Sequence, residues 1–379
     1  MIYSSSSIWA EYKFNNPYKY LITQSVFLVV GTILMIIISK ISYMYYLDKA
    51  NTLLFGCFVL LILVIIPGIG TVRNGSRSWF GIGGFGIQPS EFMKLAMIVF
   101  VSKYLYKNNK DIKNIKKGIL PILGVTLFAF GLIMLQPDFG TGVILVMSII
   151  GLLFISGVNM KFFLILGIFG VIGATLLIII APYRFQRILS FLNPWLDPLG
   201  TGFQAIQSLF AIGPGGLLGL GLGNSIQKHF YLPEPQTDFI FSIISEELGF
   251  LGIIIVSALF LTIIYRGIKI SLNSRDLFSK YLSFGIIFQA LLNLMVVVGL
   301  IPITGVTLPF LSYGGSSLLI TLCEMGILLN ISRYNKWYKL NNNIFGLKLI
   351  VIVMKYKNKL NNKKSTYRIR LYYYHYSMN

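Results

Sequence analysis

Long apolar runs, separated by polar connections, recur along most of this sequence. The run LITQSVFLVVGTILMIII (21–38) has no charged residue and nearly the length that an α-helix needs to cross a bilayer, about 20 residues. Charged residues make up only 12% of the chain, so a soluble domain would leave too much apolar surface in water. We therefore predict an all-α, polytopic membrane protein. Its nine predicted spans are residues 20–38, 52–69, 89–106, 119–135, 140–157, 161–181, 239–265, 281–301 and 313–331.

Four basic segments indicate how these spans are oriented. Residues 103–117 contain six lysines against one aspartate, and residues 266–280 contain two arginines and two lysines. A short loop lies between Lys40 and Lys49, and the tail beyond Ser332 has eleven lysines or arginines and no acidic residue. If the spans alternate, all four segments fall on one side, which the positive-inside rule assigns to the cytoplasm. The net charge of +20 therefore reflects topology, and we predict no nucleic-acid partner.

The opposite side then holds one long extracytoplasmic loop, residues 182–237, and loops beyond about 12–15 residues are usually functional. Residues 203–213 have helical periodicity and are expected to lie along the membrane surface. Residues 213–224 are rich in glycine, which favours close packing or a hinge over a phosphate site. Residues 301–317 combine two prolines, a Gly-Gly pair and six residues with hydroxyl groups. They form either a re-entrant turn that lines an external cavity or a purely structural helix break.

Asp238 lies at the outer mouth of the seventh predicted span. Thr237 and Asp238 occupy the N-cap position, just before the apolar residues 239–265 begin. Successive helical residues are about 100° apart, so several small or polar residues share the helix face of Asp238, and such a face turns toward protein or a water-filled cleft. On spacing alone, a carboxylate that caps its own helix is favoured over a catalytic base. The residues that share this face are Ser242, Ser245, Gly249 and Gly252.

Other carboxylates lie inside the predicted spans. Glu91 and Lys94 are three residues apart, so they can pair on one helix. Such a pair either faces an interior cavity or fixes helix packing, and the spacing does not decide between the two. Glu246 and Glu247 lie about two turns beyond Asp238 and point about 100° apart, so they cannot both face one cavity. Either can fix helix packing through a buried hydrogen bond.

Arg184 and Arg187 lie three residues apart, just outside a span on the external side. They bind either lipid headgroups or a phosphorylated ligand, because guanidinium groups match phosphate oxygens in a bidentate way. Cys57 and Cys323 both lie in apolar runs, and the chain has only two histidines. Neither a disulfide framework nor a histidine metal cluster is therefore expected.

Together these motifs resemble the SEDS family (shape, elongation, division and sporulation), whose members are membrane-embedded peptidoglycan glycosyltransferases. The matching stretches occur in family order and span most of residues 20–334, which makes the resemblance more specific than any single motif. The wording of the long loop is closer to the FtsW and SpoVE branch than to the RodA branch. The stretches are RSWFGIGGFGIQPSEFMKLA (77–96), LQPDFGTG (135–142), YRFQRILSFLNPWLDPLGTGFQAIQSL (183–209), GLGNSIQKHFYLPEPQTDFIFSIISEELGFLG (221–252) and TGVTLPFLSYGGSS (304–317).

The resemblance implies polymerisation of lipid II, the undecaprenyl-pyrophosphate-linked disaccharide-pentapeptide, on the outer face of the bacterial cytoplasmic membrane, in cell division or sporulation. It makes Asp238 the favoured base, which deprotonates the acceptor 4-hydroxyl as that oxygen attacks the anomeric carbon of the donor with inversion. The leaving pyrophosphate needs cations, and the resemblance leaves room for a divalent ion, Mg²⁺ or Mn²⁺, although no metal ligand is assigned. The expected substrate-binding residues are Arg77, Lys94, Arg184, Arg187, Lys228, Glu234, Thr237, Ser312 and Ser316, and the expected structural polar residues are Glu91, Asp138, Glu246 and Glu247.

The family has ten spans, so its first helix is expected to be missing here. Residues 1–334 are expected to form the transmembrane glycosyltransferase domain, and residues 335–379 a basic, disordered cytoplasmic tail. The resemblance also implies a class B penicillin-binding protein (a transpeptidase) and other division proteins of the membrane as partners. A lipid II flippase and a non-catalytic scaffold for division proteins stay open as other functions. The clustering of polar motifs at one face, without an internal repeat, favours catalysis over transport.

Overall fold

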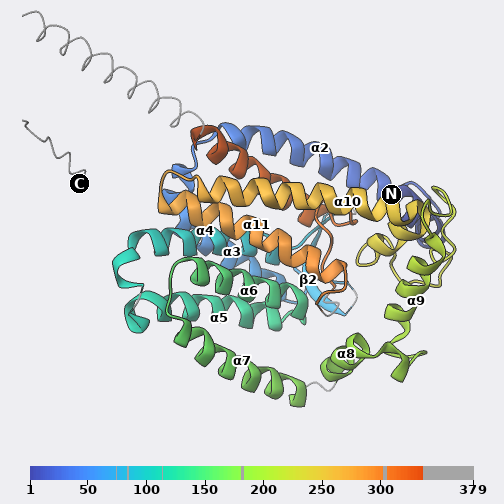
Figure 1. Cartoon of the computed structure of the whole chain (residues 1–379), viewed down its shortest axis with the longest axis horizontal. Helices are drawn as coiled ribbons and strands as arrows, with labels where there is room; N and C mark the ends of the chain where they lie inside the picture. Colours follow the sequence, from blue (N-terminus) through green and yellow to red (C-terminus); the bar gives the residue numbers. More distant parts are fainter. Residues whose placement is uncertain (74, 83–84, 113, 181–182, 302–304, 336–379) are drawn as a thin grey trace, which may run out of the picture. The chain divides into compact units, whose positions relative to one another are not determined.

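Each predicted span coincides with a helix. The computed structural model describes residues 1–73, 75–82, 85–112, 114–180, 183–301 and 305–335, and Figure 1 shows how these helices are arranged. Six helices in this part of the chain are long and apolar enough to cross a membrane, so the count of nine spans stays a prediction. The helices at the predicted spans are α2 (Lys19–Lys40), α3 (Met44–Ile65), α4 (Pro89–Lys107), α5 (Leu120–Met134), α6 (Phe139–Ile155), α7 (Met160–Ile180), α10 (Ile240–Leu272), α11 (Leu277–Val297) and a last helix, Gly315–Asn335.

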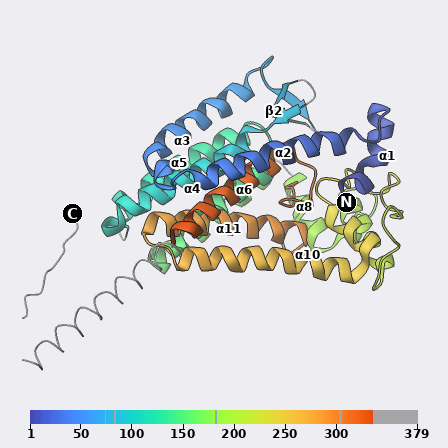
Figure 2. The same ribbon diagram turned by 90° about the horizontal axis from the view of Figure 1, so that it is seen from above.

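Helix α4 lies at the centre of the bundle. It begins at Pro89, whose fixed φ suits a first helical turn and whose missing N–H would have had no partner there. Most of its side chains are buried, among them Met93, Met97 and Val101, and it packs against α3, α6 and α11. Figures 1 and 2 show these helices side by side. Because α4 is covered by other helices, its buried charged residues, Glu91 and Lys94, face protein rather than lipid.

A small antiparallel sheet connects α3 to α4. It consists of β1 (Thr71–Arg73), β2 (Ser76–Ile82) and β3 (Phe85–Ile87), in the order β1-β2-β3. The fold was expected to be all-α, and this sheet is the exception. Its strands are too short and too glycine-rich to show a clear alternation of apolar and polar residues.

The long loop between α7 and α10 contains helices of its own. Residues 203–213 were expected to form a helix, and α9 confirms it. The tail, residues 336–379, lies outside the described residues, so the predicted domain boundary at 334 stays a prediction. The remaining elements are α1 (Ile2–Phe14), η1 (Asn109–Asp111), η2 (Ile115–Ile119), α8 (Tyr183–Leu192), η3 (Pro194–Leu196), α9 (Phe203–Ile212) and η4 (Gly213–Gly215).

The helix α10 is interrupted at Gly249, which has φ 64° and ψ −161°. In a continuous helix the Phe250 N–H would donate to the Glu246 carbonyl. Instead, Phe250 N donates to Gly216 O (2.9 Å), and Glu246 O accepts from Leu220 N (2.9 Å). The same exchange of hydrogen bonds recurs one residue further along both segments. The predicted face that continues from Asp238 to Gly252 is therefore wrong, because the helix is interrupted between them.

The glycine-rich segment 213–224 reaches this interruption through close backbone approaches. A Cβ at Gly215 would lie 2.2 Å from Ser245 O, and a Cβ at Gly219 would lie 2.2 Å from Glu247 O. Real Cβ atoms do not come so near, so only glycine fits at both positions. The expectation of close packing for this segment is confirmed.

Gly249→Ala is expected to destabilise the protein. A backbone with φ 64° and ψ −161° is essentially restricted to glycine and costs an L-residue about 1–3 kcal/mol, and the new Cβ would also lie 2.3 Å from Gly219 N. Thermal unfolding in detergent should show a lower midpoint. Gly124→Ala is the matched control, because nothing lies within 4 Å of that Cβ and α5 should gain from alanine. Equal midpoints for the two variants would contradict the expectation.

Candidate functional site

Asp238 lies two residues before α10 begins at Ile240. The N-cap residue is Phe239, whose side chain makes no cap hydrogen bond, so the predicted N-cap position at Thr237 and Asp238 is wrong. The reason is a turn that precedes the helix. Thr237 donates to Glu234 O from both its N–H (3.1 Å) and its hydroxyl (2.9 Å), which delays the start of the helical backbone.

The carboxylate of Asp238 lies on the wall of a cavity of about 690 Å³. This volume is in the usual range for small-molecule sites, about 300–1,000 Å³. The wall is formed by α8, α9, the first turn of α10, the end of α11 and residues 305–306. Among the residues that the structure describes, Asp238 is the only ionisable one that lines the cavity, and it is half-buried. Neutral polar residues also line it, namely Gln186, Ser190, Thr201, Gln204, Ser208 and Ser242.

The segment after α11 braces the backbone next to Asp238. Tyr313 N donates to Gln236 O (2.7 Å), and the Ser312 hydroxyl donates to Thr237 O (2.6 Å). The same Ser312 oxygen accepts from Leu308 N (2.9 Å), so a hydroxyl that was expected to bind substrate is buried and occupied by backbone groups. The described part of the predicted re-entrant segment lines the cavity at 305–306, whereas residues 302–304 lie outside the described residues.

Ser316 and Arg77 also lie apart from the cavity wall. Ser316 is buried, accepts a hydrogen bond from Gln88 N (2.9 Å) and donates to Gly86 O (3.1 Å). It therefore joins the last helix to the segment that leads into α4. Arg77 is half-buried on β2 and is not among the described residues that line the cavity.

The predicted ion pair on α4 is present and buried. Lys94 Nζ lies 2.8 Å from Glu91 Oε1, and the two side chains are 1% and 8% exposed. Asp138, the N-cap of α6, accepts from Gln88 Nε2 (2.8 Å) and from Thr141 N (3.2 Å). Burial raises the pKa of the Asp138 carboxyl above its ordinary value, against the opposite effect of its hydrogen bonds with Thr141. These contacts fit the structural roles expected of Glu91 and Asp138.

A further buried carboxylate, Glu324, was missed by the sequence analysis. It lies on the last helix, is 3% exposed and accepts from Gln289 Nε2 of α11 (3.2 Å). An acidic residue within the apolar run 313–331 could have indicated it, because ionisable residues in membrane spans usually face the interior of the bundle.

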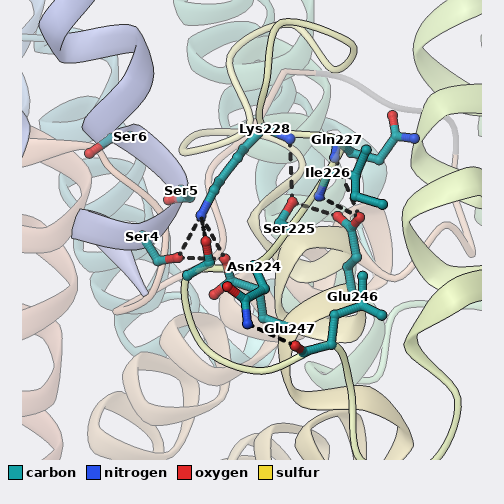
Figure 3. Close-up of polar contacts among 12 residues, drawn as sticks. Ser4, Ser5, Ser6, Asn224, Ser225, Ile226, Gln227, Lys228, Glu246 and Glu247 are labelled. Carbon is teal, nitrogen blue, oxygen red and sulfur yellow. Dashed lines mark hydrogen bonds and ion pairs between the residues drawn. The ribbon is translucent and has the colours of Figure 1, made fainter.

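Lys228, Glu246 and Glu247 form a separate buried cluster, which Figure 3 shows. Lys228 Nζ lies 3.3 Å from Glu247 Oε1, and Lys228 is 4% exposed. Its ammonium group is thus held by protein, and Lys228 does not line the cavity. The expected role of the two glutamates in helix packing fits their complete burial.

Arg184 and Arg187 lie on α8, the helix that contributes Gln186 and Ser190 to the cavity wall. The side chains of both arginines are outside the described part of the structure, so their predicted role stays a prediction.

An exposed turn connects α8 to α9. Asp197 accepts there from Gly200 N (3.0 Å) and Thr201 N (2.8 Å). These hydrogen bonds, chiefly the one from Thr201 N, lower the pKa of the Asp197 carboxyl below its ordinary value. The turn fixes Thr201, which lines the cavity.

A divalent ion has no evident ligand set here. Within the described ranges, no group of three or more His, Cys, Asp or Glu side chains lies close enough together to hold a metal.

Comparisons with known proteins give a consistent result. The family model for FtsW, RodA and SpoVE, described as "Cell cycle protein", matches residues 1–337. Stage V sporulation protein E of Bacillus subtilis is 52% identical over 341 residues, which cover 89% of this chain and 93% of that protein. A probable peptidoglycan glycosyltransferase FtsW of Coxiella burnetii is 41% identical, with coverages of 88% and 91%.

Two solved structures are similar in fold. One belongs to a peptidoglycan synthase complex described as coordinating polymerization and crosslinking, with a TM-score of 0.69 and 32% identity over 83% of this chain and 90% of that one. The other is the rod shape determining protein RodA of Thermus thermophilus, with a TM-score of 0.62 and 27% identity over 88% and 93%.

Proposed function

The chain belongs to the FtsW/RodA/SpoVE family of cell cycle proteins, and from this membership we infer that it is a peptidoglycan glycosyltransferase of the bacterial cytoplasmic membrane. The fold agrees with a multi-pass membrane protein, since six helices in the described part are long and apolar enough to span a bilayer. The enzyme polymerises peptidoglycan.

We propose that lipid II is the substrate and that Asp238 is the general base. The observation that carries this proposal is the half-buried carboxylate on the wall of a cavity of about 690 Å³. A base must lie within hydrogen-bond reach of the hydroxyl that it deprotonates, and a cavity of this size admits a sugar beside Asp238.

The transfer needs one base and one stabilised leaving group. The acceptor 4-hydroxyl oxygen forms a bond to the anomeric carbon of the donor while its proton passes to Asp238. The bond from that carbon to the pyrophosphate oxygen breaks, and the electron pair leaves with the lipid pyrophosphate. Among the described residues no second carboxylate lines the cavity, so a single displacement with inversion fits better than a covalent intermediate.

The charge of the leaving pyrophosphate requires cations near the cavity. We assign this role to Arg184 and Arg187, because α8 already supplies Gln186 and Ser190 to the wall. Lys94 and Lys228 are each held by a buried carboxylate, and so they are less suited to bind a substrate directly.

Arg184→Gln and Arg187→Gln are each expected to raise the KM for lipid II about tenfold, since a hydrogen bond to a charged group contributes about 1.5–3 kcal/mol. Strand synthesis at a series of lipid II concentrations measures this effect. Arg275→Gln, on the predicted cytoplasmic side, is the control. An unchanged KM in both variants would remove the two arginines from the site.

We also propose a class B penicillin-binding protein as the partner. The similar synthase complex joins polymerization to crosslinking, and a strand released at the membrane surface is the material that a transpeptidase cross-links.

The decisive experiment supplies purified lipid II to the full chain together with this transpeptidase. Glycan strands that lysozyme digests would support the proposed function. Movement of lipid II across liposome bilayers without any strand synthesis would instead favour the flippase. If both activities are absent while the partner binds normally, the result would favour a non-catalytic scaffold.

A further inference from the structure

Two adjacent carboxylates of α10, which we call the clamp, bind the long loop through hydrogen bonds and an ion pair. The clamp consists of Glu246 and Glu247, both completely buried. Figure 3 shows their polar contacts with residues 225–228 of the loop and with Ser4 of α1. None of these residues lines the cavity described above, and the proposed chemistry does not use them.

Glu246 binds the start of the loop segment through three donors. Its Oε1 accepts from Ile226 N (2.8 Å) and Gln227 N (3.4 Å), and its Oε2 accepts from the Ser225 hydroxyl (2.5 Å). Ser225 is 1% exposed. A carboxylate that accepts several hydrogen bonds inside protein fixes the backbone that donates them.

Glu247 binds the same segment through a charge. Its Oε1 lies 3.3 Å from Lys228 Nζ and also accepts from the Ser4 hydroxyl. Lys228 Nζ donates further to Gly223 O. A lysine and a glutamate removed from water in this way depend on each other, because either one alone would be a buried, uncompensated charge.

The clamp fixes one end of a closed loop whose other end carries Asp238. From Ile240 to Glu247 the helix rises about 10 Å, at about 1.5 Å per residue. Residues 229–238 bridge this short distance, so both of their ends are anchored on the same helix. Leu232, which is fully buried, packs with Phe239 in the middle of this loop.

We propose that the Lys228–Glu247 pair and Glu246 are positioning residues that set where the Asp238 carboxylate lies in the cavity. This inference rests on the proposed role of Asp238 as the base. A shift at residue 228 can reach Asp238 through Leu232, which is fully buried and packs against Phe239 and Ile243 of the same helix. A displacement of about 1 Å at the reacting groups is enough to cost about a hundredfold in rate.

The two charges of the Lys228–Glu247 pair can be removed separately or together. Loss of the Lys228 charge leaves Glu247 buried and unpaired, and this carboxylate then reaches water only if the loop moves away. Loss of both charges removes that driving force, while Glu246 still holds the segment. The double variant is therefore expected to return the loop to its place.

Lys228→Met and Glu247→Gln are each expected to lower kcat about tenfold or more, with KM for lipid II changed by less than about twofold. The double variant Lys228→Met/Glu247→Gln is expected to recover to within about threefold of the original kcat. Lys13→Met, an exposed lysine on α1, is the control. Rates are divided by the amount of folded protein, so that a loss of stability alone does not lower kcat. Single variants that are less stable but keep the original kcat would overturn the proposal.

A distance measurement separates this proposal from the role of Asp238. Spin labels at Tyr231→Cys in the loop and Leu259→Cys on α10 are placed at exposed positions, with Cys57 and Cys323 replaced by alanine. Lys228→Met should broaden or shift the distance distribution, and the double variant should restore it. If Lys228→Met leaves the distance distribution unchanged, or shifts it without changing kcat, the proposal that the clamp positions Asp238 is overturned. Strand synthesis that survives Asp238→Asn refutes the base instead, whatever the distances show.

Discussion

Asp238→Asn is expected to lower the rate of glycan strand synthesis by about 100- to 10,000-fold, the range that a general base contributes. The amide has nearly the size of the carboxylate, so the cavity wall and the packing of Phe239 remain as they are. It cannot accept the acceptor's proton at neutral pH. We therefore expect the loss in kcat rather than in KM, measured with purified lipid II and the transpeptidase partner.

Asp48→Asn provides the matched control for this experiment. Asp48 is an exposed aspartate near the start of α3, on the predicted cytoplasmic side, and the same chemical change there should leave the rate unaltered. Strand synthesis by Asp238→Asn at a rate close to that of the control would exclude this carboxylate as the base.

Lys94→Met is expected to destabilise the bundle strongly. The ammonium group lies 2.8 Å from Glu91 inside α4, and its removal leaves a buried carboxylate without a counter-charge. Breaking one side of a buried pair costs about 3–5 kcal/mol. Chemical denaturation in mild detergent measures the free energy of unfolding.

Two further variants decide whether the charge causes this loss. Glu91→Gln combined with Lys94→Met removes both charges and should regain a large part of the stability. Lys107→Met, at the exposed end of the same helix, should cost far less, about 0.3–1 kcal/mol. A loss from Lys94→Met no larger than that of Lys107→Met would show that the buried pair is unimportant for stability.

The helices and the α4 ion pair could be predicted because their signals are local. Long apolar runs indicate spans, and a spacing of three residues brings Glu91 and Lys94 together on any helix. Neither inference needs knowledge of what the helix packs against. The same holds for α9, whose periodicity is visible within its own ten residues.

The missed features depend on contacts between distant segments. The interruption at Gly249 exists because the glycine-rich segment exchanges hydrogen bonds with α10, and no local pattern reports that exchange. Helix α10 begins later than expected because Thr237 is engaged in a turn with Glu234. Lys228 was expected to bind substrate. Its partner Glu247 lies 19 residues further along the chain, so no local pattern indicated the ion pair.

The exchange of hydrogen bonds around Gly249 also determines which substitutions the protein tolerates. Four main-chain amides fasten the loop to α10, and main-chain groups are the same whatever side chain a residue carries. Leu217 and Leu220, two of the residues that take part, leave their side chains 71% and 37% exposed. Substitutions at such positions would change the surface that contacts lipid or a neighbouring protein. The main-chain hydrogen bonds between the loop and α10 would keep their geometry.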